Sequence, residues 1–258
     1  MTPPRNSSTG SPPVMVFVDV DNTLVKGATI YMFGIEAWKS GFIKWHHVIP
    51  ALFQQRYFIR KGETTHRLKS TRERAQSLVA GHQVKDFEKV AEVAWRRSIA
   101  PKVFPEMIER LNWHKSQGHQ TWLLTASPQG LASVMARDLG LTGAMGTTLE
   151  VNDGAFTGEI DGELLHGPLK TEAALAKASE HGVDLRTCYG YSDSAADIPL
   201  LESVGHPVAV NPDHTLLSHA TTKSWPVIWP EATNRHQAHR SNKAAKNAGR
   251  EPVTGVPQ

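Results

Sequence analysis

The chain contains a single cysteine, Cys188, among 258 residues. An internal disulfide bond and a cysteine-based zinc site each need more than one cysteine, so both are excluded. Sparse cysteine is also typical of proteins in a reducing compartment. We expect Cys188 to be a small, buried apolar side chain in a strand rather than a nucleophile.

The sequence also lacks a long hydrophobic run. Its first residues contain no apolar stretch of the kind found in signal peptides, and apolar runs elsewhere are far shorter than a membrane-spanning helix requires. We therefore expect a cytoplasmic protein. Residues 1–13, rich in Pro, Ser and Gly, and residues 232–258, which lack apolar periodicity, are predicted to be disordered tails.

Charge of the two signs is separated along the chain. Residues 26–113 hold 16 lysines and arginines against eight acidic residues, residues 232–258 hold five against one, and the remainder is acidic. An acidic site often needs a cation, and a basic surface favours anionic ligands. Solvated helix positions are an equally good interpretation of most of these basic residues. Beyond a weak attraction of the basic segments to anionic surfaces, we predict no nucleic-acid or membrane partner.

The spacing of apolar residues divides the chain into two parts. Residues 26–103 have an almost wholly helical pattern. Two aromatic helical stripes are predicted, one over residues 31–47 and one over residues 49–60. A further helix is predicted over 84–100, with one apolar face formed by Val84, Phe87, Ala91, Ala94 and Trp95. A small helical core is the usual meaning of such stripes, although an aromatic stripe can also lie on a membrane surface.

From residue 104 onward, helices alternate with short strands. We predict strands over 120–127, 187–194 and 206–213, the last of the chain, and a hairpin of residues 146–151 and 155–160 around "NDG". Strands that alternate with helices indicate a doubly wound parallel sheet. The predicted architecture is an α/β core, residues 14–25 and 104–231, with an all-helical cap, residues 26–103, inserted after the first strand.

Two aspartates follow that first strand, in the stretch "MVFVDVDNTLV" of residues 15–25. Side chains two residues apart on a strand point to the same side, so Asp19 and Asp21 are expected to face one ligand. An Asp-Asn pair after a strand is also a common turn, so this stretch alone indicates no more than a strand end.

Other polar residues are expected at the same place, because ligands of open α/β sheets bind beyond the carboxyl ends of the strands. These residues are Thr125, Ser127, Lys170, Asp193 and Asp197. Four carboxylates together raise one another's pKa, and a hard cation with oxygen ligands, Mg²⁺, relieves this. A lysine and a helix N-terminus suit a phosphate. The set predicts phosphoryl transfer, with one carboxylate as nucleophile and another as acid/base.

The ordered set resembles the haloacid dehalogenase (HAD) superfamily of phosphatases over residues 14–213. It is most similar to the phosphoserine-phosphatase-like branch, with a helical cap after motif I. "DVDNTL", "LLTAS", Lys170 and "YSDSAAD" look like motifs I to IV. The resemblance implies that Asp19 is the nucleophile and that Asp21 is the general acid/base, with a backbone carbonyl that binds Mg²⁺.

The remaining motif residues receive roles from the same resemblance. Thr125, Ser127 and Lys170 are expected to contact the phosphate. Asp193 is expected to bind Mg²⁺, and Asp197 to bind it directly or through a water molecule. For Ser127, the alternative is a cap on the helix that follows.

Three positions depart from the family pattern. Ala28 stands where phosphoserine phosphatases usually have a glutamate that meets the substrate's amino group, Ala196 replaces an asparagine of motif IV, and Ala126-Ser127 replaces Gly-Gly of motif II. These changes leave the phosphate and metal chemistry in place and disfavour phosphoserine as the substrate. The cap arginines are candidates for binding an anionic part of a larger substrate, although each alone is better interpreted as solvated. They are Arg56, Arg60, Arg72 and Arg74.

The resulting prediction is a Mg²⁺-dependent phosphatase that hydrolyses a small phosphomonoester through an aspartyl-phosphate. One alternative is a phosphotransferase that uses the same residues. Another is a catalytically silent anion- or lipid-binding protein, against which the Asp19 and Asp21 pair argues. The 13 histidines, including His46 and His47, show no compact metal-binding spacing.

Overall fold

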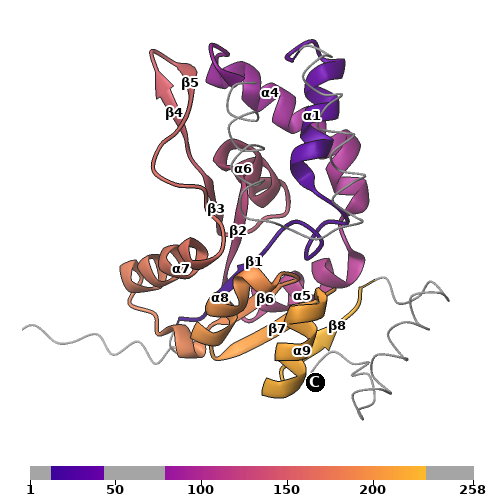
Figure 1. Cartoon of the computed structure of the whole chain (residues 1–258), viewed down its shortest axis with the longest axis vertical. Coiled ribbons are helices and arrows are strands. Elements are labelled where there is room, and N and C mark those ends of the chain that lie inside the picture. Colours follow the sequence, from indigo (N-terminus) through magenta and orange to yellow (C-terminus); the bar gives the residue numbers. More distant parts are fainter. Residues whose placement is uncertain (1–12, 44–78, 231–258) are drawn as a thin grey trace, which may run out of the picture.

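The structure is a computed structural model that describes residues 13–43 and 79–230 (Figure 1). Within this part of the chain, a parallel sheet has the strand order β3-β2-β1-β6-β7-β8. The strands are β1 (Met15–Val18), β2 (Gln120–Pro128), β3 (Gly143–Thr147), β6 (Tyr189–Ser192), β7 (His206–Val210) and β8 (Val227–Ile228). The chain runs outward from β1 in both directions, which confirms the predicted doubly wound α/β fold.

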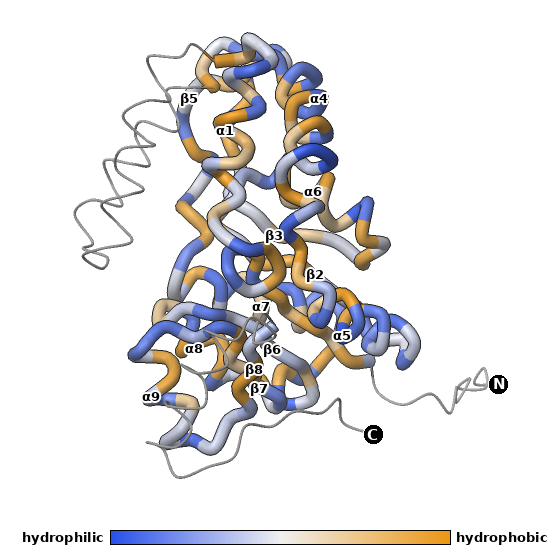
Figure 2. The backbone as a smooth tube through the Cα atoms, turned by 90° about the vertical axis from the view of Figure 1, so that its right-hand side faces the viewer, coloured by the Kyte–Doolittle hydropathy of each residue, from blue (hydrophilic) through white to orange (hydrophobic). Residues whose placement is uncertain are grey.

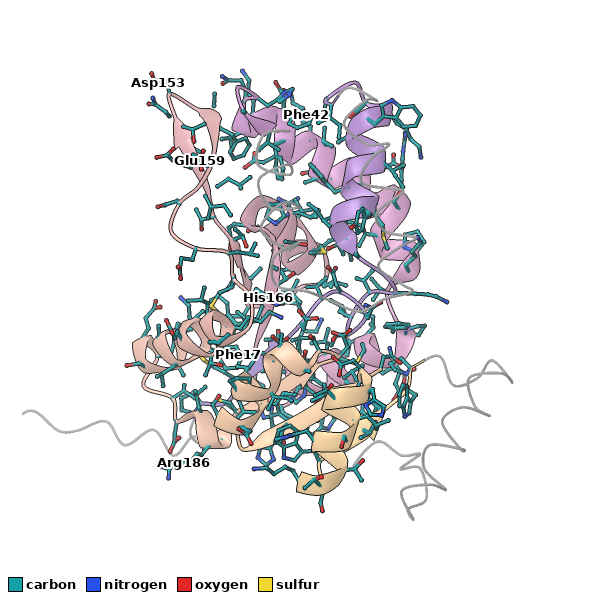
Figure 3. All side chains as sticks on the ribbon, in the orientation of Figure 1. Phe17, Phe42, Asp153, Glu159, His166 and Arg186 are labelled. Carbon is teal, nitrogen blue, oxygen red and sulfur yellow. The ribbon has the colours of Figure 1, made fainter. Side chains whose placement is uncertain are left out.

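Helices cover both faces of this sheet (Figure 1). They are α5 (Pro105–Ser116), α6 (Gln129–Asp138), α7 (Pro168–Glu180), α8 (Ile198–Ser203) and α9 (His214–Lys223). The four residues of β1 are completely buried and alternate between the faces. Val16 and Val18 pack in the cluster that contains α5 and α6, whereas Met15 and Phe17 pack with α7 and α8. Phe17 is labelled between these two helices in Figure 3.

Two long helices stand beyond the carboxyl ends of the strands. They are α1 (Thr29–Lys39) and α4 (Val84–Ala94), and the π-helical turn η1 (Trp95–Ile99) and the 3-10 turn η2 (Ala100–Lys102) lead back to the core. In Figure 2 both helices alternate between hydrophobic and hydrophilic colours, as expected for helices with one buried face. The predicted apolar face of α4 is present, with Phe87, Ala91 and Ala94 buried.

The predicted helix over residues 31–47 is too long at its C-terminal side. Helix α1 ends at Lys39, because Gly41 takes a φ of 73°, a left-handed conformation that ends helices. Residues 44–78, the middle of the predicted cap, lie outside the described part. The extent of the cap, residues 26–103, therefore stays a prediction. The same is true of the two predicted tails, of His46 and His47, and of the four cap arginines.

The predicted hairpin is present as β4 (Leu149–Asn152) and β5 (Ala155–Ile160), which pair antiparallel. Its turn residues Asp153 and Gly154 both have positive φ, as a two-residue hairpin turn requires. The hairpin leans against the cap (Figure 1). Phe156 of β5 lies edge-on to Phe87 of α4, with ring centroids 5.3 Å apart, so this hairpin braces the cap from one side.

Three elements were not predicted: β3, α9 and β8. The hairpin was expected to begin at residue 146, but residues 143–147 form β3 and pair with β2. The sequence of β3, "GAMGT", has two glycines and no apolar alternation. The strand at 206–210 is not the last, because α9 and the two-residue β8 follow it. None of the described helices is both long and apolar enough to cross a membrane.

Candidate active site

The carboxyl ends of β1 and β6 bring two aspartates together. Asp19 directly follows β1, and its backbone N–H donates to the carbonyl of Tyr191 in β6 at 2.9 Å. Asp193 directly follows β6. Strand order reverses between these two neighbouring strands, and ligands of doubly wound sheets bind at such a reversal.

Lys170 joins Asp19 to Asp197 at the centre of the site. Its ammonium nitrogen lies 2.6 Å from Asp19 Oδ1 and 2.7 Å from Asp197 Oδ2. All three residues are buried, and Lys170 is only 4% exposed. Lys170 lies in the first turn of α7, and Asp197 ends the 3-10 turn η4 (Ala195–Asp197). The structure therefore brings together residues that are up to 178 positions apart, as the sequence predicts.

Asp197 is held mainly by protein groups. Its Oδ2 atom also accepts a hydrogen bond of 2.7 Å from the hydroxyl of Ser192, a residue that the sequence did not single out. Its Oδ1 atom is buried and has no partner among the described residues. Asp197 thus orients Lys170 and keeps one oxygen for a further ligand.

The carboxylates of the site outnumber its cations. Burial raises the pKa of Asp19, although the Lys170 ammonium acts in the opposite direction. Burial, followed by repulsion from Asp19, raises the pKa of Asp193 to about 8 and that of Asp21 to about 6. Burial alone would lower the pKa of Lys170, but Asp19 and Asp197 outweigh it and hold that pKa above its usual range. The site therefore attracts positive charge.

Thr23 links the two aspartates. Its completely buried hydroxyl lies 3.3 Å from Asp19 Oδ2 and 3.4 Å from Asp193 Oδ1. Thr23 has no predicted role, although it belongs to the stretch that follows β1. Its position four residues after Asp19 offered a weak signal, because only the loop geometry turns the side chain back toward the site.

Thr125 and Ser127 lie in the irregular carboxyl end of strand β2. Its pairing with β3 shifts between Leu124 and Pro128, and such a bulge re-aims the side chains within it. The Thr125 hydroxyl oxygen accepts a hydrogen bond of 3.1 Å from the N–H of Ser127. Both residues are buried.

The backbone of Gly146 in β3 packs directly against the backbone of this irregular end of β2. A Cβ atom at Gly146 would lie 2.7 Å from the carbonyl oxygen of Ser127, which is closer than real Cβ contacts. Thr147 adds a hydrogen bond of 2.8 Å to the carbonyl of Ala126. The unpredicted strand β3 thus shapes the motif that the sequence did predict.

Ser127 does not cap the helix after it, contrary to the alternative considered from the sequence. Helix α6 begins after Pro128 and has no side-chain cap. The Ser127 hydroxyl instead lies 2.8 Å from the hydroxyl of Thr29, the first residue of α1. Thr29 in turn donates to Asp21, from its N–H at 2.9 Å and from its hydroxyl at 2.7 Å.

Cys188 is completely buried, as predicted, but it lies just before β6 rather than within a strand. Burial raises the pKa of its thiol. A buried thiol with a raised pKa is a poor nucleophile, so Cys188 takes no part in the chemistry of this site.

The residues of the site fit a hard divalent cation. Within residues 13–43 and 79–230, no three His, Cys, Asp or Glu side chains are grouped as a complete metal site. Mg²⁺, however, usually takes one or two carboxylates and completes its shell with water and substrate phosphate. Asp19 and Asp193, bridged by Thr23 and with raised pKa values, match that demand.

Comparison with known proteins identifies the family. Residues 16–202 match the family model of haloacid dehalogenase-like hydrolases. A protein of Mycobacterium tuberculosis (strain ATCC 25618 / H37Rv), named phosphoserine phosphatase SerB1, is 38% identical over 212 residues, which are 82% of this chain and 69% of that protein.

Solved structures share the fold. A protein of unknown function from Bordetella pertussis Tohama I superposes with a TM-score of 0.74 at 25% identity, over 84% of this chain and 99% of that one. A phospho-aspartyl intermediate analogue of phosphoserine phosphatase gives a TM-score of 0.60 at 22% identity, over 84% and 93%. The chain belongs to the haloacid dehalogenase-like hydrolases.

Proposed function

We propose that this chain is a Mg²⁺-dependent phosphatase that hydrolyses a phosphomonoester through an aspartyl-phosphate on Asp19. The observation that carries the proposal is the Lys170 ammonium held at 2.6 Å from Asp19 and 2.7 Å from Asp197, at the edge of a sheet where Asp193 also lies. A buried carboxylate beside one fixed cation is suited to attack a phosphoryl group, whose own negative charge would otherwise repel it.

In the first half of the reaction, an Asp19 carboxylate oxygen attacks phosphorus and the bond from phosphorus to the ester oxygen breaks. Asp21 donates its proton to that ester oxygen, so the product leaves as an alcohol. Lys170 stabilises the charge shared by Asp19 and the phosphoryl oxygens, and the Thr125 hydroxyl donates to one of those oxygens. A pKa of about 6 for Asp21 suits a group that must give and take a proton near neutral pH.

In the second half, Asp21 takes a proton from water as that water attacks the phosphorus of the aspartyl-phosphate. The bond between phosphorus and Asp19 breaks, inorganic phosphate leaves, and Asp19 and protonated Asp21 are restored for the next cycle. Asp19, Asp193 and the backbone carbonyl of Asp21 would hold Mg²⁺. The ion supplies neutralisation of the phosphate charge when bound.

The substrate we propose is a small phosphomonoester other than phosphoserine. The SerB1 relative is named for phosphoserine, but recognition of an amino group by this part of a site calls for an acidic side chain. Here Ala28, the residue before α1, presents only a methyl group. A panel of phosphomonoesters that includes phosphoserine measures this preference directly.

The test compares hydrolysis of p-nitrophenyl phosphate by the wild type and by Asp19→Asn, with Mg²⁺ and with EDTA. Asparagine keeps the shape of the side chain and removes its nucleophilic charge. We expect Mg²⁺-dependent turnover by the wild type and a loss of at least about a thousandfold in the variant. Asp153→Asn, on the exposed tip of the hairpin (Figure 3), is the matched control and should keep full activity.

Mass spectrometry of the acid-quenched wild type should find one phosphoryl group on the peptide that contains Asp19. Equal turnover by wild type and Asp19→Asn would remove Asp19 as the nucleophile. Adding an alcohol acceptor distinguishes the phosphotransferase alternative, because transfer would yield a new phosphomonoester in place of inorganic phosphate. A wild type without turnover on any phosphomonoester would point to the silent binding protein, which flotation with anionic vesicles would then test.

A further inference from the structure

Thr29 is completely buried and contacts two motif residues at once. Its N–H and its hydroxyl both donate to Asp21 Oδ1, at 2.9 Å and 2.7 Å, and its hydroxyl oxygen lies 2.8 Å from that of Ser127. Because the Thr29 proton is donated to Asp21, the Ser127 hydroxyl must donate to Thr29. The three side chains therefore form a directed chain of hydrogen bonds from Ser127 through Thr29 to Asp21.

The contact also completes the start of a cap helix. Helix α1 begins at Thr29, and its N-cap residue, Ala28, has no side chain able to accept a hydrogen bond. The first N–H groups of a helix need acceptors, and a carboxylate is favoured there. Asp21, eight residues earlier in the chain, supplies the acceptor for the Thr29 N–H. The carboxylate assigned as acid/base thus also caps the helix on which the cap is built.

The strand end at Ser127 joins this arrangement from the opposite side. Ser127 is 4% exposed, and its N–H is bound to the Thr125 hydroxyl oxygen at 3.1 Å. The carboxyl end of β2 and the first residue of the cap helix therefore meet at one hydroxyl group. A displacement of α1 relative to β2 would lengthen a bond in the chain that ends on Asp21.

We propose that Thr29 is a positioning residue, which holds the Asp21 carboxylate in the orientation needed for proton transfer and couples that orientation to the base of the cap. The proposal rests on the proposed function, since it assigns Thr29 a role through Asp21. It concerns the proton-transfer steps alone. Attack by Asp19 on phosphorus does not use Thr29.

Leaving groups of different basicity separate this role from a general structural one. An alkyl phosphate needs a proton from Asp21 as its ester bond breaks, whereas p-nitrophenolate leaves readily without one. Thr29→Val keeps the size and the backbone N–H and removes the hydroxyl. It should lower kcat for glycerol 2-phosphate about tenfold or more at nearly constant KM, a part of the total that acid/base catalysis contributes.

With p-nitrophenyl phosphate, Thr29→Val should keep the rate of the initial p-nitrophenol burst. The slower steady state that follows should fall, because Asp21 must still activate water. Thr29→Ser, which restores the hydroxyl, should recover both substrates to near wild-type rates. Thr121→Val, a buried threonine at the opposite end of β2, is the control for loss of a buried hydroxyl and should change neither rate.

Each outcome decides the proposal. Equal losses by Thr29→Val in the burst and in both steady-state rates, or wild-type rates throughout, would overturn it. Failure of Thr29→Ser to rescue would also overturn it, since the hydroxyl would then not be the acting group. If the wild type itself showed no Mg²⁺-dependent turnover, the proposed function would fail first, and that result is visible before any Thr29 variant is made.

Discussion

The two ends of strand β6 bury titratable groups of opposite kinds. Beyond its carboxyl end, Asp193 lies among carboxylates whose pKa values are raised. At its amino end, Tyr189 stacks on His206 with ring centroids 4.4 Å apart. Nearby His114, completely buried, lies 2.9 Å from His119 through their Nδ1 atoms and 2.8 Å from the Tyr191 hydroxyl through Nε2.

Burial shifts the pKa values at the two ends in opposite directions, because it disfavours the charged form in both cases. Burial lowers the pKa of His114 from 6.5 to about 3, with repulsion from His119 as the second cause. The imidazoles can respond by staying neutral among aromatic rings. A carboxylate nucleophile, the role proposed for Asp19, must stay charged, and the Lys170 ammonium 2.6 Å away favours that charge. The comparison separates an end built for packing from an end built for charge.

The largest effect is expected from Lys170→Met, which removes the fixed cation of the carboxyl end. Removing one partner of a buried ion pair costs roughly 3–5 kcal/mol of stability. Urea unfolding measures this cost, and phosphatase activity should fall below detection. The control is Lys177→Met on the same helix, whose exposed partner Glu180 lies 2.6 Å away. A drop in the urea midpoint as small as that of Lys177→Met would show that the buried pair stabilises nothing.

The two ends should respond to acid with opposite signs. His114 has a folded pKa below its unfolded value, so between pH 6.5 and about 3 the unfolded chain binds more protons and stability falls as pH falls. Asp193 has a folded pKa raised from 3.8 to about 8, so in that window the folded chain binds more protons and stability rises as pH falls. Each group contributes a slope of up to about 1.4 kcal/mol per pH unit.

Free energies of unfolding measured in EDTA between pH 4.5 and 6.5 would sharpen this contrast. His114→Gln should reduce the destabilisation by acid, and Asp193→Asn should increase it. The control is His181→Gln, at the exposed end of α7, which shows what a histidine replacement outside both ends of β6 does. If both variants changed the slope in the same direction, the two ends would not differ as the structure indicates.

The smallest effect is expected at an exposed ion pair. Arg186 lies 2.8 Å from Asp184, with side chains 85% and 50% exposed. Surface pairs of this kind contribute little to stability, because water and salt screen them. Arg186→Ala should leave the urea unfolding midpoint unchanged. A shift comparable to that of Lys170→Met would mean that burial is not what separates the two classes of ion pair.

The residues that carry most of the site could be predicted, because each lies at a strand end or helix start with a chemical type suited to phosphate. Asp19, Lys170, Asp193 and Asp197 follow from that rule. Thr29 and Ser192 were not singled out, although Thr29 begins α1 and Ser192 is the last residue of β6. Their roles depend on how the loops turn each hydroxyl toward a carboxylate five or eight residues away, and local periodicity holds no information on this.

The fold, like the site, could be predicted only in part from the sequence. Alternation of helices and strands was enough for the parallel sheet, but "GAMGT" and the two residues of β8 have no recognisable strand pattern. These short strands form because β2 and β7 present unpaired backbone groups that a neighbouring segment can satisfy. Pairing partners, rather than propensity, decide such edges.

By itself, the sequence determined the order of the chemistry-bearing residues, the doubly wound class and the membership of carboxylates and lysine in one site. These follow from residue type and from the period of apolar positions, which are local properties. Tertiary structure alone decided that Asp21 caps α1, that Ser127 reaches Thr29, and that imidazoles gather at the far end of β6. These contacts join residues from five to 98 positions apart, and only the folded loops and the packing of the sheet bring them within hydrogen-bonding range.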